Sequence, residues 1–163
     1  FPPVPTVPGE ALALILLDTN ILVYAVNRDA PRHGLCRALI AAARRKELEA
    51  AVVPQVLLEF FAVVTDRRRV RRPLDPITAW QEVEVLRAGL RVVDPGPAAL
   101  DRLAALLTQG KVAGAEVFDA WLAAQALAAG ISTICTCNAA DFAGIPGLVV
   151  REPEELAIDP GAD

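Results

Sequence analysis

The stretch Leu14–Ala25, LILLDTNILVYA, places an acid at the end of an uninterrupted apolar run. Residues 11–17 carry no charge, which is typical of a strand that is covered on both faces of a sheet. Asp18 ends this run, and the turn-forming pair Thr19 and Asn20 follows before the apolar pattern resumes in a predicted short helix. Asp18 or Asn20 could simply cap that helix. Alternatively, the strand delivers the carboxylate to a functional site, because ligands of open parallel sheets bind beyond the carboxyl ends of the strands.

The rest of the chain alternates short apolar runs with helical patterns. We predict further strands at 50–53, 91–94, 132–136 and 148–150, separated by helices or pairs of helices. This alternation implies an α/β fold with a mainly parallel central sheet, of about five strands, flanked by helices. We expect a flexible, proline-rich lead over residues 1–10, one domain over 11–153 and a loose acidic tail over 154–163.

Composition narrows the class of protein. The chain has 163 residues, of which 54% are apolar, so it can bury a substantial core and is not a disordered chain. The net charge of -4 gives no overall attraction to nucleic acid. Three cysteines are too few for a disulfide framework, so we expect a reducing, cytoplasmic location. The uncharged run 120–140 contains a glycine and several polar residues, which favours a helix followed by a strand over a membrane span.

Four acids stand at comparable corners of the predicted fold: Asp18, Glu59, Asp119 and Asp141. Each has an ordinary explanation, such as a helix cap, a favourable acid in the first turn of a helix, or an ion pair with an arginine. If the four converge, each pair repels by about 4 kcal/mol at about 4 Å and an effective dielectric constant near 20. A divalent cation would offset this repulsion, and all-oxygen sites suit Mg²⁺ or Mn²⁺.

Four segments that carry these acids resemble, in order, the motifs of the PIN domain, and within it the VapC-type toxin ribonucleases. They are LLDTNILVYA, VPQVLLEFFAVVT, VFDAWLAAQALAAG and ICTCNAADF with the following PGLVV. The resemblance implies a PIN-like three-layer fold. It also implies that Asp18, Glu59, Asp119 and Asp141 are catalytic and bind metal, with Thr136 and Asn138 in support. We expect Asn20 to orient Asp18 through hydrogen bonds.

The same resemblance implies a metal-dependent endoribonuclease that uses one or two Mg²⁺ or Mn²⁺ ions and leaves a 5′-phosphate and a 3′-hydroxyl. The expected partners are an RNA substrate, a cognate antitoxin protein and a second copy of the chain, with no membrane. The sequence itself argues against a metal-free reaction through the 2′-hydroxyl. That route usually needs a paired acid and base, often histidine, and the one histidine, His33, lies in a predicted surface helix.

A basic run, DRRRVRRP, follows the predicted helix that carries Glu59. Its arginines are Arg67, Arg68, Arg69, Arg71 and Arg72. They could bind RNA phosphates, receive an acidic partner, or simply be solvated.

Several alternatives remain open at this point. The chain could be an inactive PIN module that binds RNA or an antitoxin, or an RNA-processing PIN nuclease that is not a toxin. A phosphotransferase with Asp18 as nucleophile is disfavoured, because position 20 is Asn where that pattern needs a second Asp. Glu116 is either an additional acid near the metal or a solvated residue at a helix start. A zinc site would need the loosely spaced residues His33, Cys36, Cys135 and Cys137.

Overall fold

The computed structural model describes residues 13–109 and 112–156. Its centre is a parallel sheet of five strands in the order β3-β2-β1-β4-β5. The strands are β1 (Ile15–Leu17), β2 (Ala50–Val52), β3 (Arg91–Val92), β4 (Thr133–Cys135) and β5 (Val149–Arg151). The predicted parallel sheet is therefore confirmed.

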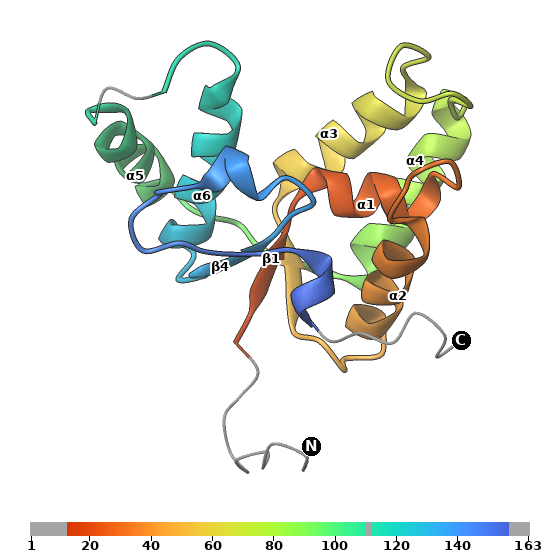
Figure 1. The fold of residues 1–163 in the computed structure, drawn as a ribbon, viewed down its shortest axis with the longest axis horizontal. Helices are drawn as coiled ribbons and strands as arrows, with labels where there is room; N and C mark the ends of the chain where they lie inside the picture. Colours follow the sequence, from red (N-terminus) through yellow and green to blue (C-terminus); the bar gives the residue numbers. More distant parts are fainter. Residues whose placement is uncertain (1–12, 110–111, 157–163) are drawn as a thin grey trace.

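In the part of the chain that the structure describes, six α-helices cover the two faces of this sheet. They are α1 (Thr19–Val26), α2 (His33–Arg44), α3 (Pro54–Thr65), α4 (Pro76–Gly89), α5 (Ala98–Leu107) and α6 (Glu116–Ala128). Figure 1 shows α5 and α6 together on one side of the central strands and α1 to α4 on the other. Within these layers α5 packs on α6, α1 packs on α2 and α3, and α3 packs on α4. The sheet and the helices on its two faces form the three layers that were predicted.

The sheet reverses its strand order at β1, which pairs with β2 on one side and with β4 on the other. β1 and β4 pair with Leu17 opposite Cys135. The backbone N–H of Asp18 then donates to the carbonyl of Cys135 at 3.0 Å. The residues that follow β1 and β4 therefore emerge side by side at the same edge. This reversal is where open α/β sheets bind their ligands.

The core explains the apolar runs in the sequence. All three residues of β1 and all three of β2 are buried, as expected of central strands covered on both faces. Two large aromatic side chains anchor segments next to acids: Phe60 in α3 follows Glu59, and Phe142 follows Asp141. Both are almost fully buried, so each fixes the backbone that presents its neighbouring carboxylate.

Two single-turn 3₁₀ helices, which were not among the predicted elements, complete the described part of the fold: η1 (Ala139–Phe142) and η2 (Pro153–Leu156). The first residues of the predicted tail belong to η2, where Glu154 forms an ion pair with Arg32 at 2.9 Å. The predicted lead, 1–10, and the rest of the tail lie outside the described residues. In the part of the chain that the structure describes, no helix has the length and apolarity needed to cross a membrane.

Candidate metal centre

Asp18 lies directly after β1 and is both a helix cap and a site residue. It is the N-cap of α1, and its Oδ1 accepts from the backbone N–H of Thr19 at 2.6 Å. Its Oδ2 accepts from the side chains of Asn20, at 2.8 Å, and Thr136, at 2.7 Å. The carboxylate is 8% exposed, and these hydrogen bonds fix both of its oxygens. The helix-cap and functional-site interpretations of Asp18 are therefore compatible.

The loop after β4 holds Asp18 in place. Thr136 donates to Asp18 and accepts from Asn20 Nδ2, at 3.0 Å, and from the backbone N–H of Asn138, at 3.0 Å. The Oδ1 atom of Asn20 accepts from the backbone N–H of Cys137 at 2.9 Å, which fixes the orientation of the Asn20 amide. Asn20 and Thr136 thus contact Asp18 directly. Asn138 acts on Asp18 only indirectly, through its hydrogen bond to Thr136.

Glu59 faces the same edge of the sheet from α3. Its Oε2 accepts from the hydroxyl of Thr19 at 2.9 Å, and its Oε1 accepts from Gln55 Nε2 at 2.6 Å. The Oε1 atom of Gln55 in turn accepts from Nε2 of Gln125, which is buried in α6, at 2.5 Å. Gln55 and Gln125, the glutamine pair, connect the helix that carries Glu59 to the helix that carries Asp119.

Asp119 and Asp141 approach from the other side of the sheet. Asp119 lies in the first turn of α6, and Asp141 lies in η1, where its Oδ2 accepts from Asn138 Nδ2 at 2.6 Å. Among the described residues, no side chain or backbone group forms a hydrogen bond with the Asp119 carboxylate. Asp119 is therefore the least constrained of the four acids.

One hollow of about 620 Å³ collects all four acids. Asp18 and Asn20 come from the β1–α1 corner, Glu59 from α3, Asp119 from α6 and Asp141 from η1. The wall also includes apolar and basic side chains, among them Tyr24, Val63, Phe118 and Arg69. Residues that are up to 123 positions apart in the sequence are thus assembled at one place.

Burial and mutual repulsion raise the pKa of two of these acids. Desolvation raises the pKa of Asp18 to about 6, against the opposing hydrogen bonds from Thr136 and Thr19. Desolvation, followed by the charges of Asp141, Asp18 and Glu59, raises the pKa of Asp119 to about 6. The charges of neighbouring acids thus add to the effect of burial on the pKa of Asp18 and of Asp119, as expected of groups that share one small volume.

The donor set fits a hard divalent cation, because it consists of carboxylate oxygens joined by hydroxyl and amide groups. The acids are distributed around the wall of the hollow. In the described part of the chain, no three acid, histidine or cysteine side chains already surround a common point as ligands would. A cation in this hollow would draw the carboxylates inward and relieve the repulsion that raises the pKa of Asp119.

Two of the other sequence hypotheses concern residues outside this hollow. Glu116 is exposed at the start of α6 and accepts from the backbone N–H of Ala113 at 3.1 Å, although its charge contributes to the raised pKa of Asp119. His33 Nδ1 contacts the carbonyl of Tyr24 at 2.9 Å. Within residues 13–109 and 112–156, the proposed zinc ligands form no cluster of three or more.

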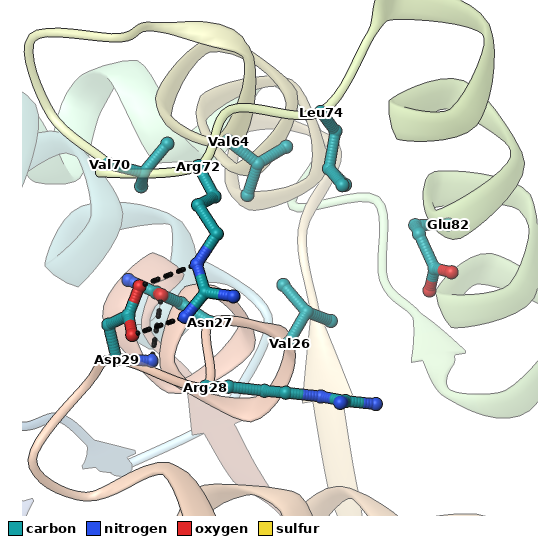
Figure 2. Close-up of a pocket in the computed structure, with 9 residues that line it drawn as sticks. All are labelled: Val26, Asn27, Arg28, Asp29, Val64, Val70, Arg72, Leu74 and Glu82. Atoms are coloured by element: carbon teal, nitrogen blue, oxygen red, sulfur yellow. Dashed lines mark hydrogen bonds and ion pairs between the residues drawn. The ribbon is translucent and has the colours of Figure 1, made fainter.

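The five arginines of the basic run have different surroundings. Arg68 pairs with Asp66 at 3.1 Å, and Arg72 pairs with Asp29 at 2.9 Å. Figure 2 shows Arg72 reaching from the α3–α4 connection to Asp29, over a second pocket that adjoins the acidic hollow. Arg69 lines the acidic hollow itself. Arg67 and Arg71 are exposed and lie in neither lining.

The glutamine pair was not predicted from the sequence. Glutamine is an ordinary helix former, so neither residue is conspicuous by propensity. Gln125 does stand in an otherwise apolar stretch, AWLAAQALAA, where a buried amide needs a specific partner. That contrast is the available sequence signal, and it does not identify Gln55 or Glu59 as the partners.

Comparison with known proteins agrees with this fold. The PIN domain family model matches residues 15–148. Ribonuclease VapC24 of Mycobacterium tuberculosis (strain CDC 1551 / Oshkosh) is 30% identical over 132 residues, covering 79% of this chain and 89% of that protein. VapC ribonuclease Mb2897 of Mycobacterium bovis (strain ATCC BAA-935 / AF2122/97) is 32% identical over 116 residues, covering 70% and 79%.

Solved structures share the fold at lower sequence identity. A chain of VapBC2 from Rickettsia felis, bound to a DNA fragment from its promoter, superposes with a TM-score of 0.63 and is 23% identical. That match covers 85% of this chain and 98% of the other. Mycobacterium tuberculosis VapC20, a sarcin-ricin loop cleaving toxin, gives a TM-score of 0.58 and 18% identity, covering 82% and 98%. With the family match and the two relatives, these likenesses show that the chain belongs to the PIN domain family, among the VapC ribonucleases.

Proposed function

We propose that this chain is a divalent-metal-dependent endoribonuclease that hydrolyses RNA phosphodiester bonds as the toxin of a toxin–antitoxin pair. The observation that carries the proposal is the convergence of Asp18, Glu59, Asp119 and Asp141 on one hollow at the reversal of the sheet. A purely structural role does not account for four carboxylates in a shared volume, where burial and the neighbouring acids raise the pKa of both Asp18 and Asp119. The relatives named as ribonucleases support the choice of RNA as substrate.

Each side chain has a distinct task in this proposal. The four acids would hold one or two Mg²⁺ or Mn²⁺ ions, which, when bound, activate water and stabilise charge on a phosphoryl group. Asn20 and Thr136 keep both oxygens of Asp18 at fixed positions. Thr19 and Gln55 donate to the two carboxylate oxygens of Glu59 and keep them at fixed positions. Asn138 restrains Asp141. Loss of a partner that orients a metal ligand typically costs about 10- to 100-fold in metal affinity or activity.

The substrate would reach the hollow along the side that carries the basic run. Arg69 lines the hollow and forms no ion pair among the described residues, so its guanidinium is available to a phosphate. Arg67 and Arg71 are exposed nearby in the sequence and would contribute attraction over a longer range. Arg68 and Arg72 are already paired with acids, so we assign them a smaller part in RNA binding.

Cleavage of a mixed RNA pool by the purified protein tests the proposal. Parallel reactions contain Mg²⁺, Mn²⁺ or a chelator, and the variants are Asp119→Asn and, as a matched control, Asp101→Asn on the exposed side of α5. We expect cleavage with either cation, loss with the chelator and in Asp119→Asn, and normal cleavage in Asp101→Asn. Absence of both cleavage and calorimetric cation binding would overturn the proposal in favour of a binding module.

The proposed function also predicts which proteins bind this chain. Some structural neighbours are VapBC complexes, so we propose that this chain also binds a cognate antitoxin and forms a homodimer. Large apolar side chains are exposed on α3, α5 and α6, including Leu58, Leu100 and Phe118, and they offer surface for such contacts. Light scattering after size-exclusion chromatography measures the mass of the chain alone. A monomeric mass across the concentration range would contradict the homodimer.

A further inference from the structure

Two cysteines from distant parts of the chain face each other beside the acidic hollow. The Sγ atoms of Cys36, in α2, and Cys137, directly after the Thr136 that follows β4, are 3.8 Å apart, although 101 positions separate them in the sequence. Cys36 is buried and Cys137 is half-buried, so reagents reach Cys137 first. Cys135 is buried and, among the described residues, forms no hydrogen bond with either sulfur, which makes it a suitable comparison.

The surroundings of Cys137 favour reactivity. Arg32 places a guanidinium beside it and donates to its backbone carbonyl at 3.0 Å. The hydrogen bond from Cys36 and the positive charge of Arg32 lower the pKa of the Cys137 thiol, whereas burial raises the pKa of Cys135 to about 12. A partly exposed thiol with a cationic neighbour, next to a second thiol, is the usual arrangement of an oxidation-sensitive cysteine pair.

We propose that Cys36 and Cys137 form a modification site that hydrogen peroxide oxidises to an intramolecular disulfide, and that this disulfide weakens cation binding by the four acids. The first part stands on the geometry of the two sulfurs alone. The second part rests on the proposed function.

The reaction balances with one peroxide for each pair. The Cys137 thiolate attacks one peroxide oxygen, the O–O bond breaks, and the products are Cys137 sulfenic acid and hydroxide. The Cys36 sulfur then displaces the sulfenic oxygen as water and forms the S–S bond. Overall, two thiols and one hydrogen peroxide give one disulfide and two waters, with both sulfurs oxidised and both peroxide oxygens reduced.

The connection to the acids runs through the backbone of Cys137. A disulfide needs the sulfurs about 2 Å apart, so closing the observed 3.8 Å separation has to move the two side chains, and in this proposal the loop that carries Cys137 moves with them. The N–H of Cys137 fixes the Asn20 amide, and Asn20 donates to Asp18. The neighbouring Thr136 also donates to Asp18. A shift of this loop therefore displaces two of the three groups that hold Asp18 in position.

The test uses the full chain, purified reduced and treated with stoichiometric hydrogen peroxide. We expect the count of free thiols in denaturant to fall from three to one, with the protein still a single chain on a non-reducing gel. Trypsin releases HGLCR, which contains Cys36, and a long peptide that contains both Cys135 and Cys137. Cys135→Ser identifies the partner, because the cross-link persists in this variant and is lost in Cys137→Ser.

The coupling to the acids is read by calorimetry with Mn²⁺ on reduced, oxidised and re-reduced protein. We expect oxidation to weaken Mn²⁺ binding by about 10-fold, as for loss of a group that orients a ligand, and dithiothreitol to restore it. Cys36→Ser should keep its affinity through peroxide treatment. Three remaining thiols, or a cross-link through Cys135, would overturn the site. An unchanged affinity in the disulfide form would overturn the coupling, whereas no Mn²⁺ binding by reduced protein points to failure of the proposed function.

Discussion

Asp18 and Asp119 have pKa values raised to the same value, about 6, but their surroundings differ. Asp18 is buried after β1 and accepts hydrogen bonds from Thr19, Asn20 and Thr136. Asp119 is half-buried in α6, and its carboxylate accepts no hydrogen bond from the described residues. The fold thus holds Asp18 in place before any cation binds, whereas burial and the charges of its neighbours act on Asp119 and no hydrogen bond from the described residues fixes its carboxylate. One side of the site is preorganised and the other is adjustable.

The largest expected effect is the loss of RNA cleavage when either acid is replaced. The two substitutions should nevertheless differ in their effect on stability. Asp18→Asn and Asp119→Asn should each lower RNA cleavage by at least about 100-fold, as for loss of an essential electrostatic group. In chelator at pH 7.5, Asp119→Asn should raise the thermal midpoint, because it removes repulsion. The corresponding gain in the free energy of unfolding is expected to be below about 1 kcal/mol, because solvent screens the charge of Asp119.

Asp18→Asn should behave in the opposite way without metal. The new amide turns an N–H₂ group toward donors from Thr19, Asn20 and Thr136, so one buried donor loses its acceptor, at a cost of about 1–3 kcal/mol. The measurement is thermal unfolding of both variants and the unmodified chain in the same buffer. Equal midpoints for the two variants would contradict the difference drawn between the two acids.

Cation binding should stabilise the fold more at pH 7.5 than at pH 5. Because the folded-state pKa values of Asp18 and Asp119 lie above the ordinary 3.8, their contribution to the free energy of unfolding is greatest below about pH 4 and falls as the pH rises through about 6. Above pH 6 both acids are ionised and available to a cation. At a cation concentration of 100 times Kd the gain is about 2.7 kcal/mol. Thermal unfolding with and without Mn²⁺ at both pH values measures it, and a larger gain at pH 5 would refute the assignment.

The glutamine pair should matter for cation affinity more than for folding. Replacing Gln55 by Ala removes the donor to Glu59 Oε1, and replacing Gln125 by Leu removes the group that orients Gln55. We expect each change to weaken Mn²⁺ binding by about 10-fold, with Gln81→Ala, on the exposed side of α4, as control. The double variant should be no worse than Gln55→Ala, because Gln125 acts on Glu59 through Gln55. Additive losses in calorimetry would show that Gln125 has another role.

The smallest expected effect concerns the arginines. Arg69→Ala should raise the KM for RNA a few-fold and reduce its dependence on salt, because Arg69 lines the hollow. Arg68→Ala should change KM less, since Arg68 is paired with Asp66. Steady-state cleavage at several salt concentrations distinguishes the two variants. Identical changes would mean that the whole run acts as a diffuse positive surface.

The sequence was sufficient to predict the sheet, because its strands depend on local patterns, and it singled out the four acids that the structure brings to one hollow. The uncharged run before Asp18 predicts a central strand, which the structure confirms as β1. The resemblance to PIN domain motifs supplied the common role of Glu59 and Asp141, which no local spacing reveals.

Contacts between distant segments could not be predicted. The ion pair between Arg72 and Asp29, which distinguishes Arg72 from Arg69, joins residues 43 positions apart. The contact between Gln55 and Gln125 spans 70 positions. The 3₁₀ helix η1 is one turn long, too short to leave a hydrophobic period in the sequence. Local patterns show which elements form, but these pairings depend on how the elements pack.

The dual position of Asp18, as N-cap of α1 and as an acid of the hollow, has a consequence for how such a chain changes over time. A substitution at Asp18 is expected to damage the start of a helix as well as the proposed site, and so to remove folded protein together with activity. A substitution at Asp119 is expected to abolish activity and to leave a fold that is at least as stable. Lineages that keep the protein for binding but lose its enzymatic activity are therefore expected to lose Asp119 first and to retain Asp18.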